Sequence, residues 1–81
     1  MEYSYKTRGV CSREIHFKVE DGKLTDMEFI GGCNGNLKGI SALCQGKEPK
    51  EVAKILKGIT CGAKSTSCPD QLAKAIEELS L

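Results

Sequence analysis

The sequence predicts a small α+β domain: an antiparallel sheet of two or three strands, followed by three helices packed on one of its faces. Two observations favour this class. Apolar and polar residues alternate over residues 13–20, as in a half-buried strand, whereas apolar residues recur at helical spacing in three segments after residue 34. With 81 residues, 40% of them hydrophobic, the chain has enough apolar surface for one core. We therefore expect a single domain over residues 1–81.

A β-hairpin is predicted over residues 12–30. Its first strand alternates polar residues with three apolar ones, Ile15, Phe17 and Val19. The dipeptide Asp21-Gly22 fits a two-residue hairpin turn, which needs positive φ. Alternation near the N-terminus predicts a third antiparallel strand over residues 2–8.

Three helices are predicted after the hairpin. The first covers about residues 35–45, and the second begins at Pro49 and is closed by Gly58. The third runs from Pro69 to the C-terminus, with Cys68 expected as its N-cap, where the helix dipole favours a thiolate.

Charge and hydropathy narrow the function classes. Twelve basic and eleven acidic residues give a formal charge of +1, so no broad basic face is expected and a nucleic-acid partner is disfavoured. No uncharged apolar stretch approaches the ~20 residues that a bilayer requires, and the first residues lack an apolar leader segment. We expect no membrane association and a cytoplasmic location.

Five cysteines are the unusual feature of the composition. Their odd number and the expected reducing compartment argue against structural disulfides and favour metal or thiol chemistry. Four of them fall at a strand start, in glycine-rich segments or at a helix start, and are the predicted thiolate ligands of one metal site: Cys11, Cys33, Cys61 and Cys68. Cys44 extends the apolar stripe of the first helix and is predicted to be core.

Other candidate site residues carry weaker signals. Cys11 shares the strand parity of Ile15 and Phe17, so its sulfur is expected to face the helices. His16 falls on the opposite, polar face and is expected to be solvated. Backbone N–H groups at the start of the first helix could cradle an anion or nucleotide, with Gly32, Asn34, Gly35 and Asn36 as the candidates.

The string Thr66-Ser67-Cys68-Pro69-Asp70 resembles the signature of the TSCPD family. The segments around Cys11, around Cys33 and around Cys61 also resemble that family, in its short, stand-alone four-cysteine branch, and its four cysteines fall on the predicted ligands. Related domains occur at the C-terminus of adenosylcobalamin-dependent ribonucleotide reductases. The resemblance implies a context of nucleotide reduction, and stand-alone members are often labelled ribonucleoside-diphosphate reductase.

A second resemblance concerns the fold. The order of cysteines, hairpin and helices is similar to the NifU-type iron-sulfur cluster scaffold domain, whose cluster ligands would fall on Cys11, Cys33 and Cys68. Arg13 stands where that family has an aspartate associated with cluster lability, and Cys61 supplies a fourth thiolate. A closed four-sulfur site holds its metal, so stable binding is favoured over transient assembly.

Three functions are consistent with these features. The favoured one is a small metal-binding module that holds zinc or an iron-sulfur cluster and serves a larger partner, with ribonucleotide reductase as a candidate. The first alternative is an accessory or thiol-redox component of ribonucleoside-diphosphate reduction, an oxidoreductase step of DNA synthesis, using Cys61 and Cys68. The second is an iron-sulfur scaffold or carrier. The chain is too short for a complete reductase, so we do not expect an enzyme by itself. A homo-oligomer is compatible with the sequence.

Overall fold

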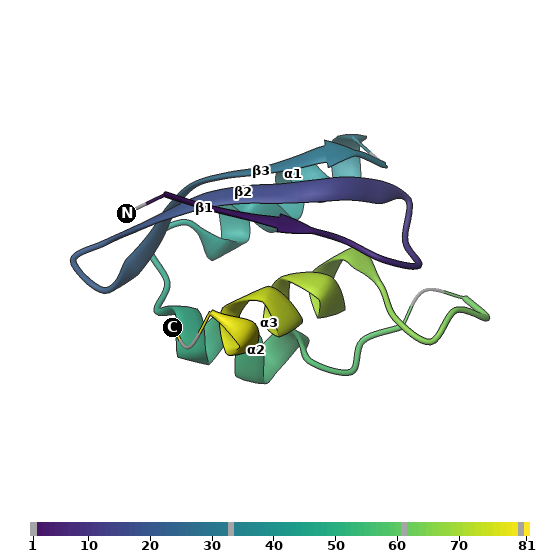
Figure 1. The fold of residues 1–81 in the computed structure, drawn as a ribbon. Helices are drawn as coiled ribbons and strands as arrows, with labels where there is room; N and C mark the ends of the chain where they lie inside the picture. The colour runs from purple at the N-terminus through teal and green to yellow at the C-terminus, as the bar shows by residue number, and fades with distance from the viewer. Residues whose placement is uncertain (1, 33, 61, 80) are drawn as a thin grey trace.

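The computed structural model of the chain describes residues 2–32, 34–60, 62–79 and 81, without the side chain of Asn34. Three antiparallel strands, β1 (Glu2–Lys6), β2 (Ser12–Glu20) and β3 (Lys23–Gly31), form one sheet in the order β1-β2-β3. Three helices follow, α1 (Asn34–Cys44), α2 (Pro49–Leu56) and α3 (Cys68–Glu78) (Figure 1). The predicted α+β class and order of elements are confirmed.

The hairpin turn has the predicted conformation. Asp21 and Gly22 both have positive φ, 52° and 75°, and Glu20 faces Lys23 across the turn. Two irregularities interrupt the pairing of β2 with β3, one between Ser12 and Glu14 and one between His16 and Lys18. Each adds a residue to one strand and changes which side chains share a face.

The helix boundaries lie close to the predicted ones, with one correction at α3. Pro49 occupies the first turn of α2, and that helix is followed by Lys57 and Gly58. The N-cap of α3 is Ser67, whose hydroxyl accepts a hydrogen bond from the Asp70 backbone, and not Cys68. A hydroxyl oxygen is a much better acceptor than a thiol, so the cap falls one residue earlier and Cys68 is the first helical residue.

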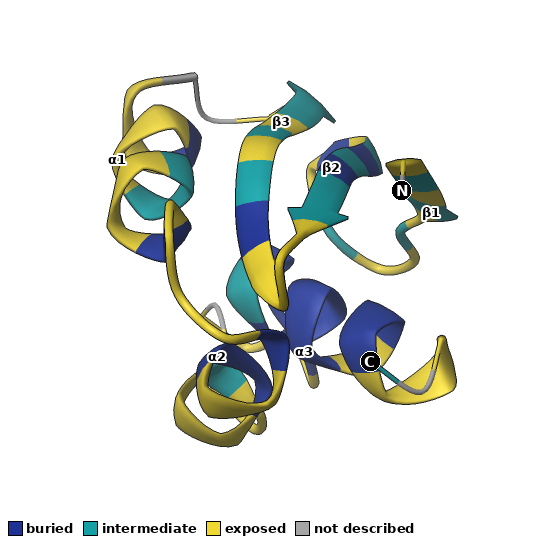
Figure 2. Ribbon diagram, turned by 90° about the vertical axis from the view of Figure 1, so that its left-hand side faces the viewer, coloured by how far each residue is buried: buried dark blue, intermediate teal, exposed yellow. Residues whose placement is uncertain are grey.

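One face of the sheet carries the core. Figure 2 shows α1 beside β3 and the other two helices below the strands, with buried residues facing this interior. The core draws on the sheet and on all three helices: Ile15, Phe17, Leu24, Cys44, Val52, Ala53, Leu72, Ala73, Ala75 and Ile76. The opposite face of β2 carries Glu14, His16 and Lys18. The helices therefore cover one side of the sheet, as the alternation in β2 predicts.

None of the helices in the described part of the chain is long and apolar enough to span a membrane.

Candidate functional site

Cys11 lies directly before β2 and is exposed, so it does not share the burial of Ile15 and Phe17 that its strand parity predicts. The physical reason is the irregularity between Ser12 and Glu14, which shifts the parity at the start of the strand. Ser12 is the residue that turns inward, with 3% of its surface exposed.

Ser12 connects the start of β2 to the start of α3. Its Oγ lies 3.1 Å from the Sγ of Cys68, a contact in which either atom could donate. Cys68 is itself buried, with 7% of its surface exposed. Since Ser12 follows Cys11 in the chain, this contact brings the segments of two proposed ligands together although 56 residues separate Ser12 from Cys68.

Gly32, the residue directly before Cys33, lies against Cys11. It has φ +80°, and a Cβ at this position would stand 3.3 Å from the Cys11 Sγ and 3.0 Å from the Ser12 backbone nitrogen. It would also stand 2.9 Å from the Leu37 side chain. Only glycine fits this conformation and this close approach. The end of β3 is thereby held beside the Cys11 sulfur.

Both ends of the loop that carries Cys61 are hydrogen-bonded to the first turn of α3. The Gly58 backbone donates a hydrogen bond of 2.7 Å to the Asp70 carboxylate. Ser67 Oγ donates one of 2.7 Å to the Ile59 carbonyl. Thr66 Oγ1 donates to the second carboxylate oxygen of Asp70. Asp70 as a residue is only 3% exposed. The loop therefore leaves from and returns to the N-terminus of α3.

The electrostatics of Asp70 follow from these contacts. Burial by itself raises the pKa of this carboxyl, but the hydrogen bonds from Thr66 and Gly58 and the nearby Lys74 ammonium stabilise its charged form. The net effect is a pKa below the usual range for aspartate. A charged Asp70 can accept hydrogen bonds from both ends of the loop.

Two of the four predicted cysteine ligands lie within the described residues. The Cys11 and Cys68 segments lie together, whereas Cys33 and Cys61 lie outside the described residues. Among residues 2–32, 34–60, 62–79 and 81 no group of three His, Cys, Asp or Glu side chains could hold an ion. Half of the proposed ligands lie outside that set, so the four-cysteine site stays a prediction.

Cys44 belongs to the core, as predicted. It is 5% exposed, and burial raises the pKa of its thiol, an effect that Lys47 partly offsets. The Lys47 carbonyl accepts a hydrogen bond from Leu24, which pairs with Val19 near the hairpin turn. Val19 is seven residues along β2 from Ser12, or roughly 23 Å in a strand. Cys44 thus lies at the opposite end of the sheet from Cys11.

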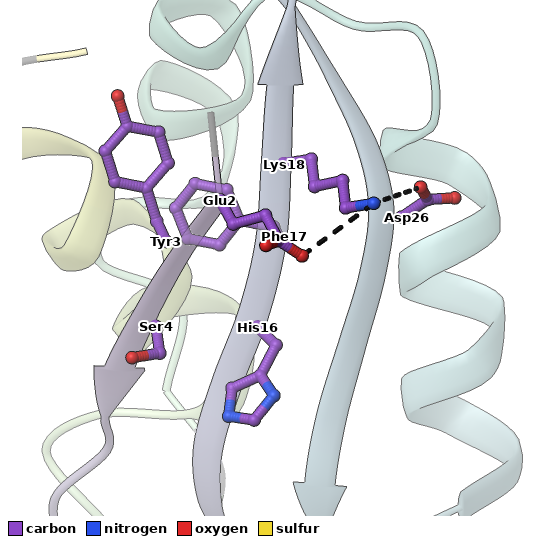
Figure 3. Close-up of a pocket in the computed structure, with 7 residues that line it drawn as sticks. All are labelled: Glu2, Tyr3, Ser4, His16, Phe17, Lys18 and Asp26. Carbon is purple, nitrogen blue, oxygen red and sulfur yellow. Dashed lines mark ion pairs between the residues drawn. The ribbon is translucent and has the colours of Figure 1, made fainter.

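His16 lies on the polar face of the sheet, as predicted. Its side chain is 44% exposed and lies 3.6 Å from the Glu14 carboxylate. It lines a pocket of about 280 Å³ on the outer face (Figure 3), where the Lys18 ammonium contacts Glu2 at 3.7 Å and Asp26 at 3.5 Å. None of the described cysteines lines this pocket.

The candidate anion site at the start of α1 stays a prediction. Gly32 has positive φ, and Gly35 and Asn36 are exposed at the start of the helix. The side chain of Asn34 lies outside the described residues.

Sequence reasoning missed a polar network around α3. Gln71 Nε2 donates to Thr66 Oγ1 at 3.0 Å, and Gln71 Oε1 accepts from the Arg8 backbone at 3.0 Å. Four of these polar residues are less than 7% exposed: Thr66, Ser67, Asp70 and Gln71. Three of them belong to the Thr66–Asp70 string, so the motif was a signal for this role. Ser12 carried no such signal, because its burial depends on the strand irregularity.

The fold and this arrangement define a small α+β domain in which the start of β2, next to Cys11, meets Cys68 at the start of the last helix. Within that class, the chain belongs to the TSCPD domain family, whose sequence profile matches residues 1–80. No curated protein and no solved structure matches the chain.

Proposed function

We propose that this protein is a small metal-binding module in which four cysteine thiolates hold zinc or an iron-sulfur cluster: Cys11, Cys33, Cys61 and Cys68. The observation that supports it best is the meeting of three chain segments at one end of the sheet. The Cys11 sulfur lies against Gly32, the neighbour of Cys33, while Ser12, the neighbour of Cys11, contacts the Cys68 sulfur.

The described residues fit such a group chemically. Cys68 is the first residue of α3, where the helix dipole favours a thiolate. The Ser12 hydroxyl can donate a hydrogen bond to that sulfur, as the neighbours of metal-bound thiolates commonly do. Four thiolates suit both a tetrahedral zinc site and an iron-sulfur cluster. When bound, the metal would supply a cross-link between the sheet and the last helix.

Energetics favour a structural role for the metal. The core of an 81-residue domain supplies only a few kcal/mol of net stability. Structural zinc contributes about 10–16 kcal/mol of apparent binding free energy, which is larger. A closed four-sulfur site also retains its metal, which favours a stable module over a transient cluster scaffold.

The family context points to a larger partner. TSCPD-related domains occur at the C-terminus of ribonucleotide reductases, so we infer that this module serves a nucleotide-reducing enzyme in deoxyribonucleotide synthesis. A dithiol shuttle made of Cys61 and Cys68 is less well supported. A shuttle needs accessible sulfurs, and Cys68 is 7% exposed and in contact with Ser12.

The test is metal analysis with an absorption spectrum of protein purified anaerobically. We expect about one zinc per chain and no colour, or iron and sulfide with a brown colour. Replacing Cys11, Cys33, Cys61 or Cys68 with serine should each sharply lower the metal content. Cys44→Ala is the matched control, because this cysteine lies at the other end of the sheet. Equal metal content in all five variants, or no metal in the parent protein, would refute the proposal.

A further inference from the structure

A groove runs between strand β1 and helix α3, and neither of the described proposed ligands, Cys11 and Cys68, lines it. It has a volume of about 640 Å³. In the described part of the chain it is lined by residues of β1, of the segments that follow β1 and precede α3, and of α3 itself: Tyr5, Lys6, Arg8, Gly9, Ser65, Thr66, Gln71, Lys74 and Glu78. This volume lies within the range of natural ligand-binding clefts. Its chemistry differs from that of the core, because most of the lining is polar or charged.

One wall of the groove is an edge of the sheet. β1 pairs with β2 on one side, and in Figure 2 no described strand or helix lies beyond it on the other. The Thr7 backbone donates to the Arg13 carbonyl. Because hydrogen-bonded and outward-facing residues alternate in an antiparallel pair, the backbone groups of Ser4 and Lys6 point away from β2. These groups can pair with another extended chain.

The floor of the groove is fixed by the polar network described above. Gln71 accepts a hydrogen bond from the Arg8 backbone and donates one to Thr66. Gln71 and Thr66 are 4% and 6% exposed. The loop after β1 is thereby anchored to α3, so the two walls keep their separation and a ligand need not organise them.

The charge of the groove is positive. Three cationic side chains, those of Lys6, Arg8 and Lys74, face a single carboxylate, that of Glu78. The Glu78 carboxylate already accepts a hydrogen bond of 2.7 Å from Tyr5. Within the described residues, Lys6 and Arg8 form no ion pair, and Lys74 contacts Asp70 at 3.5 Å. An anionic ligand would therefore meet more positive than negative charge, and Arg8 has no carboxylate partner in the described part of the chain.

We propose that this groove binds an extended acidic peptide segment of a partner protein, which adds to β1 as a fourth strand. Its backbone would pair with the outward groups of Ser4 and Lys6, and its carboxylates would face Arg8 and Lys74. The proposal goes beyond the proposed function and rests on it only for the existence of a partner, since it requires no metal.

A second copy of this chain fits the groove less well. Pairing of two five-residue β1 strands would bury well below the ~1,200 Å² of a stable interface, and each copy would bring its own cations to the contact. A free polyphosphate would match the charge but would leave the strand edge unused. Both remain as distinguishable outcomes of the test.

The experiment uses the full-length protein and three probes: a heptapeptide of alternating valine and glutamate, the same peptide with lysine for glutamate, and inorganic pyrophosphate. Binding is followed by backbone amide NMR shifts and by fluorescence anisotropy of labelled peptide. We expect the glutamate peptide to shift amides of β1 and α3, the lysine peptide to bind at least about tenfold more weakly, and binding to weaken with added salt.

Two variants test separately how the edge of β1 and the positive charge of the groove contribute to peptide binding. Ser4→Pro removes an outward N–H that the ladder does not use, so it should abolish peptide binding with little loss of folding. Arg8→Glu should weaken binding about tenfold, whereas Lys23→Glu, the same charge change at the hairpin turn, should not. Arg8→Glu keeps the test decisive if Ser4→Pro does not fold.

Three results would overturn the proposal. One is equal binding of the glutamate and lysine peptides. Another is binding of pyrophosphate at Arg8 and Lys74 without binding of the glutamate peptide. The third is a concentration-dependent dimer, measured by sedimentation, that Ser4→Pro dissociates. Metal content is measured on the same samples, so loss of the proposed metal function and loss of peptide binding are observed independently.

Discussion

The two ends of the sheet use cysteine in opposite ways. At the start of β2, Cys11 is exposed and Cys68 meets a serine hydroxyl, among polar side chains that are buried yet hydrogen-bonded. Near the hairpin turn, Cys44 is buried in the apolar core. The same residue type is thus a candidate ligand at one end and a small apolar side chain at the other. Local environment, and not residue type, separates the two roles.

The buried polar residues at the start of α3 form one hydrogen-bonded network. Thr66, Ser67, Asp70 and Gln71 each have hydrogen-bond partners despite their burial. In the described part of the chain, Thr25 on β3 is the residue whose buried side-chain oxygen has none. A buried network in which every polar group is hydrogen-bonded holds its residues in one geometry. For a metal site, this fixed geometry matters more than additional stability.

The largest effect should come from removing the metal that we propose. A strong chelator should lower the melting temperature by tens of degrees, because a change of 1 kcal/mol moves a domain of this size by about 4–8 °C. Thermal melts before and after chelation, with metal loss confirmed by analysis, are the measurement. If the metal is removed and the melting temperature hardly changes, the metal does not act as a structural cross-link between the sheet and helix α3.

Asp70→Ala should disrupt the hydrogen-bond network at the start of α3 without removing a proposed ligand. It leaves the Thr66 hydroxyl and the Gly58 amide without their acceptor, so we expect a loss of about 2–4 kcal/mol in unfolding free energy. Chemical denaturation of metal-free, reduced protein measures it. The control is Glu77→Ala, an exposed carboxylate paired with Lys57, which should cost less than about 0.5 kcal/mol. Similar losses in both variants would contradict the role of Asp70.

Two glycines provide the next comparison, one from each end. Both Gly32 and Gly22 have positive φ, but a Cβ on Gly22 would meet nothing within 4 Å. Gly22→Ala should therefore cost about 1 kcal/mol from backbone strain alone. Gly32→Ala should cost about 2–4 kcal/mol, because the Ser12 backbone cannot move aside as a side chain can. Denaturation gives both values, and metal content should fall in Gly32→Ala alone. Equal costs would show that the close approach to Cys11 is unimportant.

Thiol reactivity in metal-free, reduced protein compares the two ends directly. Cys11 should react with iodoacetamide at least about a hundredfold faster than Cys44, which reacts only through opening of the core. Mass spectrometry of the digested protein measures both rates. Comparable rates would place Cys44 outside the core.

The pKa of Cys44 adds a pH dependence. Because burial raises it, the unfolded chain loses this proton at lower pH than the folded protein. The contribution of the neutral thiol is complete below the ordinary cysteine pKa and is lost as pH rises through the folded value. Cys44→Ala should cost about 1 kcal/mol at pH 7 and less at pH 10.

The sequence by itself determined the order of the elements. Alternation through Ile15 and Phe17, the Asp21-Gly22 turn and the prolines at helix starts are local signals, and the strands and helices form where they predict. The separation of Cys44 from the other cysteines was also local, because the apolar stripe of α1 assigns it to the core.

Tertiary structure decided what lies at the site. The irregularity in β2 turned Ser12 inward and left Cys11 exposed, and such an irregularity depends on the pairing partner. The contact of Ser12 with Cys68 and the approach of Gly32 to Cys11 join segments that are far apart in the chain. Periodicity describes neighbours along one element, whereas the approach of Gly32 to Cys11 needs the pairing of β2 with β3, and the contact of Ser12 with Cys68 needs helix α3 packed on the sheet.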